Sequence, residues 1–210
     1  MADDSVIEPV VPTASAEPGE PRKRRLAPFI ALAVAAVLGG LFWVLASSHA
    51  GSPDKLGVID SPLIGRPAPT VRSATLDGTT IDLARRKGSW VVVNFFNSTC
   101  APCRAEHPEL VKFADQQQSL GAQAAEFYTV LQYSDNVEDV KAFFLNAGGN
   151  WPIIRDDDGT VNVAFGVAQV PETFIIDPSG VVRLRWAGQI DAVTLAQLVQ
   201  QQRDIYGAQG

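Results

Sequence analysis

The 210-residue chain contains two cysteines, which stand close together as Cys100-Ala101-Pro102-Cys103. An apolar run of strand length ends just before them and helical signals follow, which predicts that they open a helix. A thiol in the first turn of a helix lies beside unpaired backbone N–H groups and the positive end of the helix dipole, so its thiolate is favoured. Cys103 follows one turn later, within reach of a small disulfide ring with Cys100. The spacing therefore predicts reversible dithiol–disulfide exchange, with Cys100 as the nucleophile.

Two other uses of the cysteine pair stay open at this point. A static disulfide would gain little stability, because closing so short a loop removes little chain entropy. A metal site would need further ligands, and His107 is the only histidine near the pair in sequence. Pro102 favours a helix start, since its missing N–H would be unpaired in the first turn in any case.

Strand and helix signals alternate around the cysteines. Trp90–Phe96 is a nearly continuous apolar run, typical of a central strand covered on both faces. The helix after it is predicted from Ala101 to about Leu120, where Gly121 closes it. The remaining pattern predicts a hairpin of strands over 71–75 and 79–83, further strands over 126–133, 152–155, 173–177 and 181–186, and helices over 137–147, 160–165 and 191–205. Strands that alternate with helices imply an α/β sandwich with a mixed sheet.

The first 61 residues differ in character from the rest. Residues 1–25 form a predicted disordered tail, rich in acids and prolines and closed by Arg22-Lys23-Arg24-Arg25. Residues 26–46 follow without one charge, and about 20 apolar residues suffice for a helix to span a ~30 Å hydrocarbon layer. We therefore predict a transmembrane anchor over 26–46, a linker over 47–61 and one domain over 62–210.

The charges around the apolar stretch predict its orientation. The basic residues precede it and only Lys55 follows soon after, which places the N-terminus in the cytoplasm and the domain outside it. A cleavable secretory signal, which would release the domain, is the alternative, because Ser48-His49-Ala50 loosely resembles a cleavage site. The lipid bilayer is thus a predicted partner, whereas a net charge of −6 argues against nucleic acid.

Two blocks of the sequence carry a family resemblance. The block Val91–Pro108, with Cys-Ala-Pro-Cys at its centre, resembles the active-site stretch of thioredoxin-like proteins of the TlpA, ResA and CcmG (DsbE) type. Gly166–Asp177, which contains Val-Pro-Glu-Thr-Phe, looks like the same family's segment with the cis-proline. The likeness covers roughly Pro62 to the C-terminus. It implies a thioredoxin-like sandwich, in which a mixed central sheet has helices on both faces, with an extra N-terminal β-hairpin and a central helix and strand insertion.

The resemblance assigns catalytic roles to three residues. Cys100 is implied to be the attacking thiol and Cys103 the resolving thiol. Glu106 matches an acidic residue that the family keeps beside the dithiol, where it would raise thiol pKa values and accept a proton from Cys103. An acid favoured by the dipole at the start of the helix is the plainer interpretation of Glu106, and the two are compatible.

The resemblance also indicates where substrate would bind. Pro171 is implied to be cis and to lie opposite the cysteines, although an ordinary loop proline is the alternative. The backbone of Val170 would form hydrogen bonds with an extended substrate segment. The residues that flank the reactive thiol, Thr99, Ala101 and Pro102, would complete this face.

The sequence departs from the family pattern at two positions. Most relatives have Trp where Thr99 stands, so the shape and polarity of the substrate face differ. Asn94 occupies the place of a buried acid in thioredoxin, and because an amide does not titrate, any proton role shifts toward Glu106. His107 is expected to be a surface or packing residue, and Trp90 and Trp151 are expected in the core.

These features together predict a membrane-anchored, extracytoplasmic thiol–disulfide oxidoreductase that reduces disulfides through Cys100 and Cys103. The resemblance points to apocytochrome c as the substrate and to a CcdA- or DsbD-like membrane protein as the electron donor. No organic cofactor or metal is expected. The alternatives are a general disulfide oxidase or reductase, a peroxiredoxin-like peroxidase and a Sco-like copper chaperone. Peroxiredoxins place Thr three residues before their Cys, and Sco proteins use three residues between their cysteines, so neither spacing fits.

Overall fold

The computed structural model describes residues 27–47 and 57–207, which belong to two separate units. In the first unit, α1 (Ala27–Ser47) is an apolar helix over the stretch for which the sequence predicts an anchor. No helix within the described residues is long and apolar enough to cross a membrane. The predicted tail over 1–25 and most of the predicted linker lie outside the described residues.

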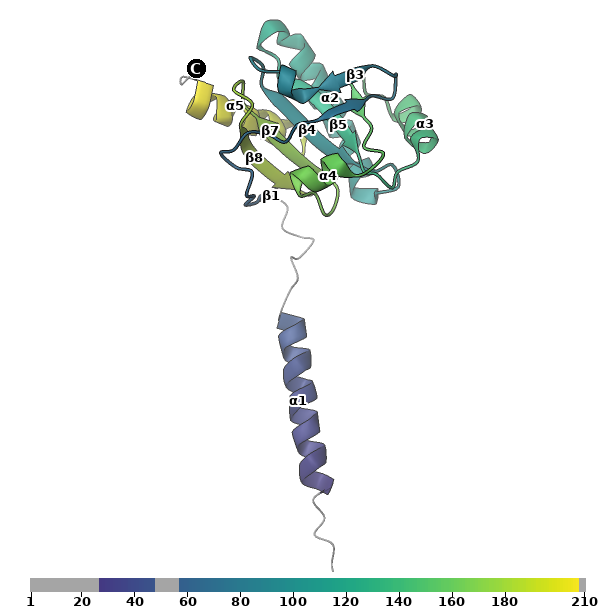
Figure 1. The fold of residues 1–210 in the computed structure, drawn as a ribbon, viewed down its shortest axis with the longest axis vertical. Helices are drawn as coiled ribbons and strands as arrows, with labels where there is room; N and C mark the ends of the chain where they lie inside the picture. Colours follow the sequence, from purple (N-terminus) through teal and green to yellow (C-terminus); the bar gives the residue numbers. More distant parts are fainter. Residues whose placement is uncertain (1–26, 48–56, 208–210) are drawn as a thin grey trace, which may run out of the picture. The chain divides into compact units, whose positions relative to one another are not determined.

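A six-stranded mixed sheet forms the centre of the second unit (Figure 1). Its strands lie in the order β1 (Gly57–Val58), β8 (Val182–Ala187), β7 (Glu172–Ile176), β4 (Val91–Phe96), β5 (Glu126–Leu131) and β6 (Ile153–Ile154). The pairs β4–β5 and β5–β6 are parallel, whereas the other three neighbouring pairs are antiparallel. All six residues of β4 are buried, as predicted for a central strand covered on both faces.

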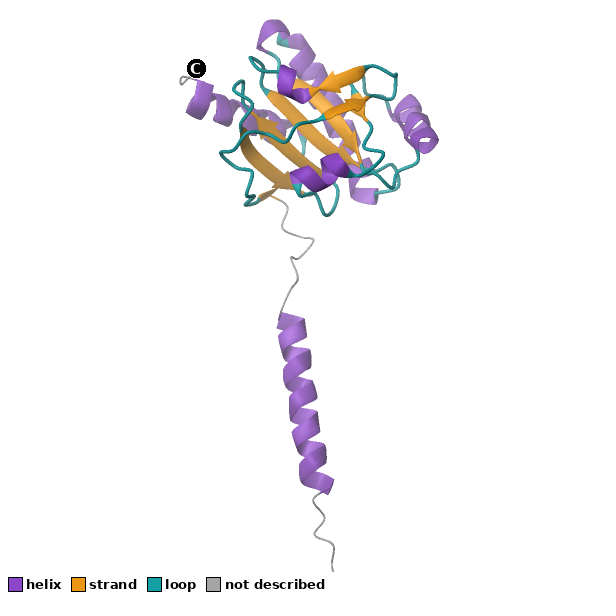
Figure 2. Cartoon of the chain, in the orientation of Figure 1, coloured by secondary structure: helices purple, strands orange, loops and turns teal. Residues whose placement is uncertain are grey.

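Helices cover both faces of this sheet, as expected from the resemblance (Figure 2). On one face, α2 (Ala101–Ser119) and α5 (Ala192–Tyr206) bury their apolar positions with Val92. On the same face, α3 (Val137–Ala147) packs against Phe96, whose side chain points the same way as that of Val92 because strand residues alternate. On the other face lie α4 (Thr160–Phe165) and the hairpin of β2 (Arg72–Ala74) and β3 (Thr80–Asp82), which pack with Val93 and Phe95.

Most predicted elements agree with the observed ones to within a few residues, and α3 and α4 have the predicted bounds. The 3₁₀ turns Leu83–Arg85 and Gly121–Gln123 follow β3 and α2. The linker predicted over 47–61 is wrong at its C-terminal end, because β1 pairs there with β8. A strand of two residues is too short to show an alternating pattern, and its pairing with the sheet edge gives no local signal.

Candidate redox site

The helix α2 begins where the sequence predicts, directly after the cysteine that caps it. Cys100 has an extended backbone, and its sulfur accepts a hydrogen bond from the backbone N–H of Cys103 at 3.2 Å. Pro102 occupies the first turn, where its lack of an N–H costs no hydrogen bond. The sulfur of Cys100 therefore lies at the N-terminal end of α2, among backbone N–H groups that favour a thiolate once the pair is reduced.

A disulfide joins Cys100 to Cys103, whose Cα atoms lie 5.2 Å apart. The two sulfurs differ in access to solvent, because Cys103 is fully buried whereas Cys100 is half-buried. A partner molecule can thus approach the sulfur of Cys100 but not that of Cys103. This difference in exposure suits Cys100 as the nucleophile and Cys103 as the resolving thiol.

The loop before β7 brings Pro171 to the disulfide. The Val170–Pro171 peptide bond is cis, as the resemblance implied. The carbonyl oxygen of Val170 lies 3.5 Å from the sulfur of Cys100. The carbonyl of Pro171 accepts a hydrogen bond from the N–H of Gly188 at 2.9 Å. Segments 70 residues apart in sequence therefore meet at the reactive sulfur.

The predicted substrate face is solvent-exposed at Thr99, Ala101 and Pro102. The side chain of Thr99 is held by Asn97, whose Oδ1 accepts from the N–H of Thr99 at 2.8 Å and from its hydroxyl at 2.7 Å. At the position where most relatives have Trp, this chain therefore has the small side chain of Thr99, whose hydroxyl is already hydrogen-bonded to Asn97.

Asp135, which sequence reasoning missed, fixes the turn between β4 and α2. Its carboxylate accepts from the backbone N–H of Ser98 and from the Ser98 hydroxyl, both at 2.6 Å. Ser98 is buried, whereas Asp135 is only partly buried. Asp135 lies in the loop between β5 and α3, and a single acidic residue in a loop gives no sequence signal for a contact with Ser98.

Glu106 lies on the same buried side of α2 as Cys103, three residues away. Its Oε1 accepts from the Asn94 side chain at 3.0 Å, and its Oε2 accepts from the N–H of Ile190 at 3.1 Å. Burial raises the pKa of Glu106 to about 8, although both hydrogen bonds favour the charged form. Burial is the largest cause of this shift, in agreement with an exposure of only 2% for Glu106.

Asn94 connects Glu106 to the neighbouring strand. Its Nδ2 also donates to the hydroxyl of Thr173 at 3.2 Å, while its Oδ1 has no hydrogen-bond partner within the part of the chain that the structure describes. The amide thus supplies a donor, not a titratable group, beside the carboxyl. Of these two side chains, only that of Glu106 can take up or release a proton.

The loop between β8 and α5 completes the site. The sequence analysis did not predict this role of the loop. Besides the N–H of Ile190, it contributes the Gln189 side chain, which donates to the carbonyl of Pro102 at 3.1 Å. The indole N–H of Trp186 donates to the carbonyl of Gln189 at 3.1 Å. These bonds hold the loop against the first turn of α2.

His107 is a packing residue and not a surface one. It is 1% exposed, and its Nε2 forms a hydrogen bond with the carbonyl of Gly148 at 2.9 Å. Four aromatic rings pack around it: Phe96, Phe143, Phe144 and Trp151. Burial lowers the pKa of His107. Trp90 and Trp151 pack into the core as expected.

A buried ion pair follows the cis-proline. Glu172 accepts two hydrogen bonds from Arg185 on the adjacent strand, at 2.7 and 3.0 Å. Both side chains are mostly buried, at 7% and 13% exposure. Burial raises the pKa of Glu172, while the guanidinium opposes that shift. The pair joins β7 to β8 just beyond Pro171.

Comparisons with known proteins agree with this geometry. Residues 64–185 match the AhpC/TSA family. The chain is similar to the "thiol:disulfide interchange protein DsbE homolog" of Paracoccus denitrificans, with 36% identity over 174 residues that cover 79% of this chain and 88% of that protein. It is 33% identical over 168 residues to the DsbE protein of Yersinia pestis, covering 78% and 84% of the two chains.

A solved structure shows the same fold with a similar description. The thioredoxin-family thiol:disulfide interchange protein of Chlorobium tepidum TLS matches with a TM-score of 0.58 and 26% identity, covering 68% of this chain and 98% of that one. The Cys100–Cys103 disulfide lies at the start of α2 in this fold. The chain therefore belongs to the AhpC/TSA family, as a DsbE-like thiol–disulfide oxidoreductase with a thioredoxin-like fold.

Proposed function

We propose that the protein works as a disulfide reductase on protein substrates outside the cytoplasm. The observation that carries the proposal is the asymmetry of the disulfide, in which Cys100 is partly exposed beside the Val170 carbonyl and Cys103 is buried. A sulfur that a substrate can reach, backed by one that it cannot, suits attack followed by intramolecular release.

In the proposed cycle, the reduced pair gives two electrons to the substrate disulfide, and each substrate sulfur takes up a proton from the solvent. The Cys100 thiolate attacks one sulfur of a substrate disulfide, which breaks that bond and frees one substrate thiolate to take up a proton. Cys103 then loses its proton and attacks the sulfur of Cys100. This second step forms the Cys100–Cys103 bond and breaks the bond between Cys100 and the substrate, whose sulfur leaves as a thiolate and takes up a proton from the solvent.

Glu106 is proposed to accept the proton that Cys103 loses. The described disulfide is the product of that step, and a carboxyl with a pKa of about 8 holds a proton at neutral pH. The buried position of both groups on one side of α2 supports a transfer within the protein. Substrate would lie along Val170 and the exposed residues Thr99, Ala101 and Pro102.

The identity of the substrate and of the electron donor is proposed from the family resemblance. We propose apocytochrome c as the substrate and a CcdA- or DsbD-like membrane protein as the donor that reduces the pair again, with no organic cofactor or metal. Deletion of the gene should then lower c-type cytochrome levels. Normal levels after deletion would remove this substrate and leave a general disulfide reductase.

The proposed location is the outer side of the cytoplasmic membrane, with residues 26–46 as the anchor. Protease added to spheroplasts should digest the domain while the cytoplasm stays closed, and the digested chain should sediment with membranes. A domain that is protected from the protease would contradict the location. A domain found free in the medium would indicate cleavage of the N-terminal segment.

The direction of the reaction is tested by the reduction potential of the pair. The reductant thioredoxin has a potential of about −270 mV, whereas the strong oxidant DsbA lies near −120 mV. We expect a reduction potential on the reducing side. We also expect the full chain to reduce insulin when dithiothreitol is supplied, and the Cys100→Ser variant not to do so. A potential near that of DsbA would reverse the assignment to a disulfide oxidase.

A further inference from the structure

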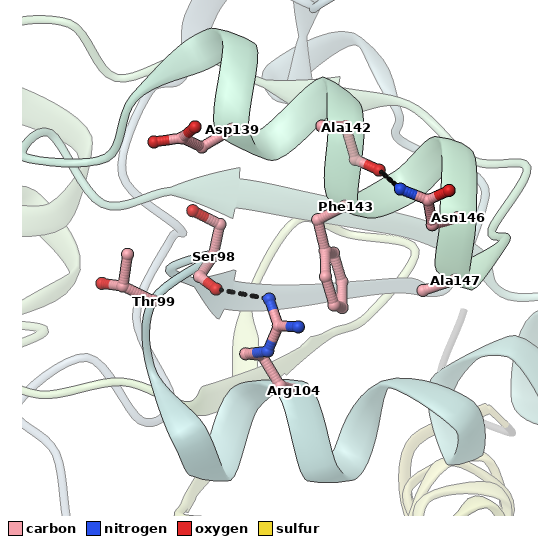
Figure 3. Close-up of a pocket in the computed structure, with 8 residues that line it drawn as sticks. All are labelled: Ser98, Thr99, Arg104, Asp139, Ala142, Phe143, Asn146 and Ala147. Carbon is pink, nitrogen blue, oxygen red and sulfur yellow. Dashed lines mark hydrogen bonds between the residues drawn. The ribbon is translucent and has the colours of Figure 1, made fainter.

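A cavity of about 450 Å³ opens beside the reactive disulfide, between the start of α2 and the helix α3 (Figure 3). Ser98 and Thr99, which line it, directly precede Cys100 in the chain. A substrate segment bonded to Cys100 would therefore pass close to its opening. Two alanines also line the cavity, together with four larger side chains: Arg104, Asp139, Phe143 and Asn146.

Arg104 is an exposed residue that lines this cavity, and two contacts hold its side chain in place. Its Nη1 donates to the carbonyl oxygen of Ser98 at 3.1 Å, and its guanidinium lies 4.8 Å from the centre of the Phe143 ring. A guanidinium has five N–H donors, and no second hydrogen bond of this one is found within residues 57–207. The cation is thus oriented before any ligand arrives, with donors left for a carboxylate.

Two other polar side chains that line the cavity, those of Asp139 and Asn146, do not contact the free donors of Arg104. Asp139 lies on the side of Thr99, and no ion pair joins it to Arg104 in the described part of the chain (Figure 3). The Asn146 side chain is turned back to the carbonyl of Ala142, to which its Nδ2 donates at 2.8 Å. The surface beside the guanidinium is otherwise the ring of Phe143 and small side chains.

We propose that the cavity is a specificity subsite for an acidic side chain that lies close in sequence to the substrate cysteine. The carboxylate would pair with Arg104, and its methylene groups would pack on Phe143. Exposed charges more than about 8 Å from the carboxylate are largely screened at physiological salt, so among acidic residues only those near the cavity, such as Asp139, oppose this contact. The inference rests on the proposed function, since the substrate must first reach Cys100.

The test compares three peptides that differ only in the residues flanking one cysteine of an internal disulfide: Glu, Gln or Lys. The reduced full chain is mixed with each peptide, and each second-order rate constant is divided by the rate constant of the same peptide with dithiothreitol. This ratio removes the effect of the flanking charges on the peptide's own reactivity. We expect the Glu peptide to react about fivefold faster than the Lys peptide, as for a partly exposed ion pair.

Variants of the cation make the test specific. Arg104→Gln should bring the Glu and Lys peptides to equal rates, and Arg104→Glu should invert the preference. Lys112→Glu is the matched control, because Lys112 is an exposed residue of the same helix that pairs with Glu109, and it should leave the preference unchanged. A ratio between peptides does not depend on the fraction of each variant that is folded.

Two results would overturn the proposal. One is equal rates for the three peptides with the unchanged chain, and the other is a loss of preference in Lys112→Glu as large as in Arg104→Glu. Failure to reduce any peptide, although the cysteine pair is reduced, would instead overturn the proposed function and the subsite with it.

Discussion

Glu106 connects the stability of the protein to pH. Burial raises its pKa from an ordinary 4.5 to about 8, so the folded chain holds this proton more tightly than the unfolded chain does. The stability that depends on the protonated carboxyl is therefore complete below about pH 4.5 and is lost as the pH rises to about 8.

Glu106→Gln should remove this loss, since the amide cannot ionise. As the pH rises from 4.5 to 8, we expect the free energy of unfolding of the unchanged chain to fall by on the order of 4 kcal/mol relative to that of the variant. Urea unfolding of both oxidised proteins across this range measures the difference. Parallel curves for the two proteins would show that Glu106 titrates as an ordinary surface acid.

The ion pair of Glu172 and Arg185 shows the cost of leaving one buried charge alone. Arg185→Ala leaves the Glu172 carboxylate buried without its cation, so we expect a loss of about 3 kcal/mol in the free energy of unfolding at pH 7. Arg155→Ala is the control, because it breaks an exposed pair with Asp157 and should cost no more than about 1 kcal/mol. Equal losses in the two variants would contradict the role assigned to burial.

At the scale of elements, the turn between β4 and α2 depends on Asp135. Asp135→Ala removes both acceptors of the buried Ser98, and we expect the free energy of unfolding to fall by about 2 kcal/mol. Asp135→Asn retains one acceptor oxygen and should restore part of this loss. The exposed Asp115→Ala in α2 should change stability by less than about 0.5 kcal/mol. If Asp135→Ala matches Asp115→Ala in urea unfolding, the turn is held by other contacts.

The elements that carry the cysteines were predictable because their signals are local. The apolar run of β4, the proline in the first turn of α2 and the Cys-x-x-Cys spacing all lie within about 15 residues of sequence. The contacts that hold the site are not local: Asp135 is 37 residues from Ser98, and Gln189 is 87 residues from Pro102. Single polar residues in loops give no periodic pattern, so neither contact was predictable.

The burial of Glu106 could be predicted only in part. The resemblance placed an acid near the dithiol, and the sequence shows it three residues after Cys103. Its actual environment depends on Asn94 from β4 and Ile190 from the loop before α5. Such an environment exists only when the sheet and both helices are assembled, and the sequence alone does not give the resulting pKa.

At the scale of the whole molecule, the site is the meeting point of three distant segments of the domain. The start of α2 supplies both sulfurs, the loop before β7 supplies the Val170 carbonyl, and the loop before α5 supplies donors to Pro102 and Glu106. The sheet order, with β4 beside β7 and β7 beside β8, brings these segments together at one end of the sheet. The fold thus exposes one sulfur and buries the other.

The most direct test of this account is to trap the substrate on Cys100. In Cys103→Ser the second step is blocked, so mixed disulfides between Cys100 and substrate proteins should accumulate in cells and appear as reducible adducts on non-reducing gels. Cys100→Ser with an intact Cys103 should form none, because the remaining thiol is buried. Adducts on Cys103 in place of Cys100, or no adducts from a folded Cys103→Ser chain, would contradict the exchange mechanism.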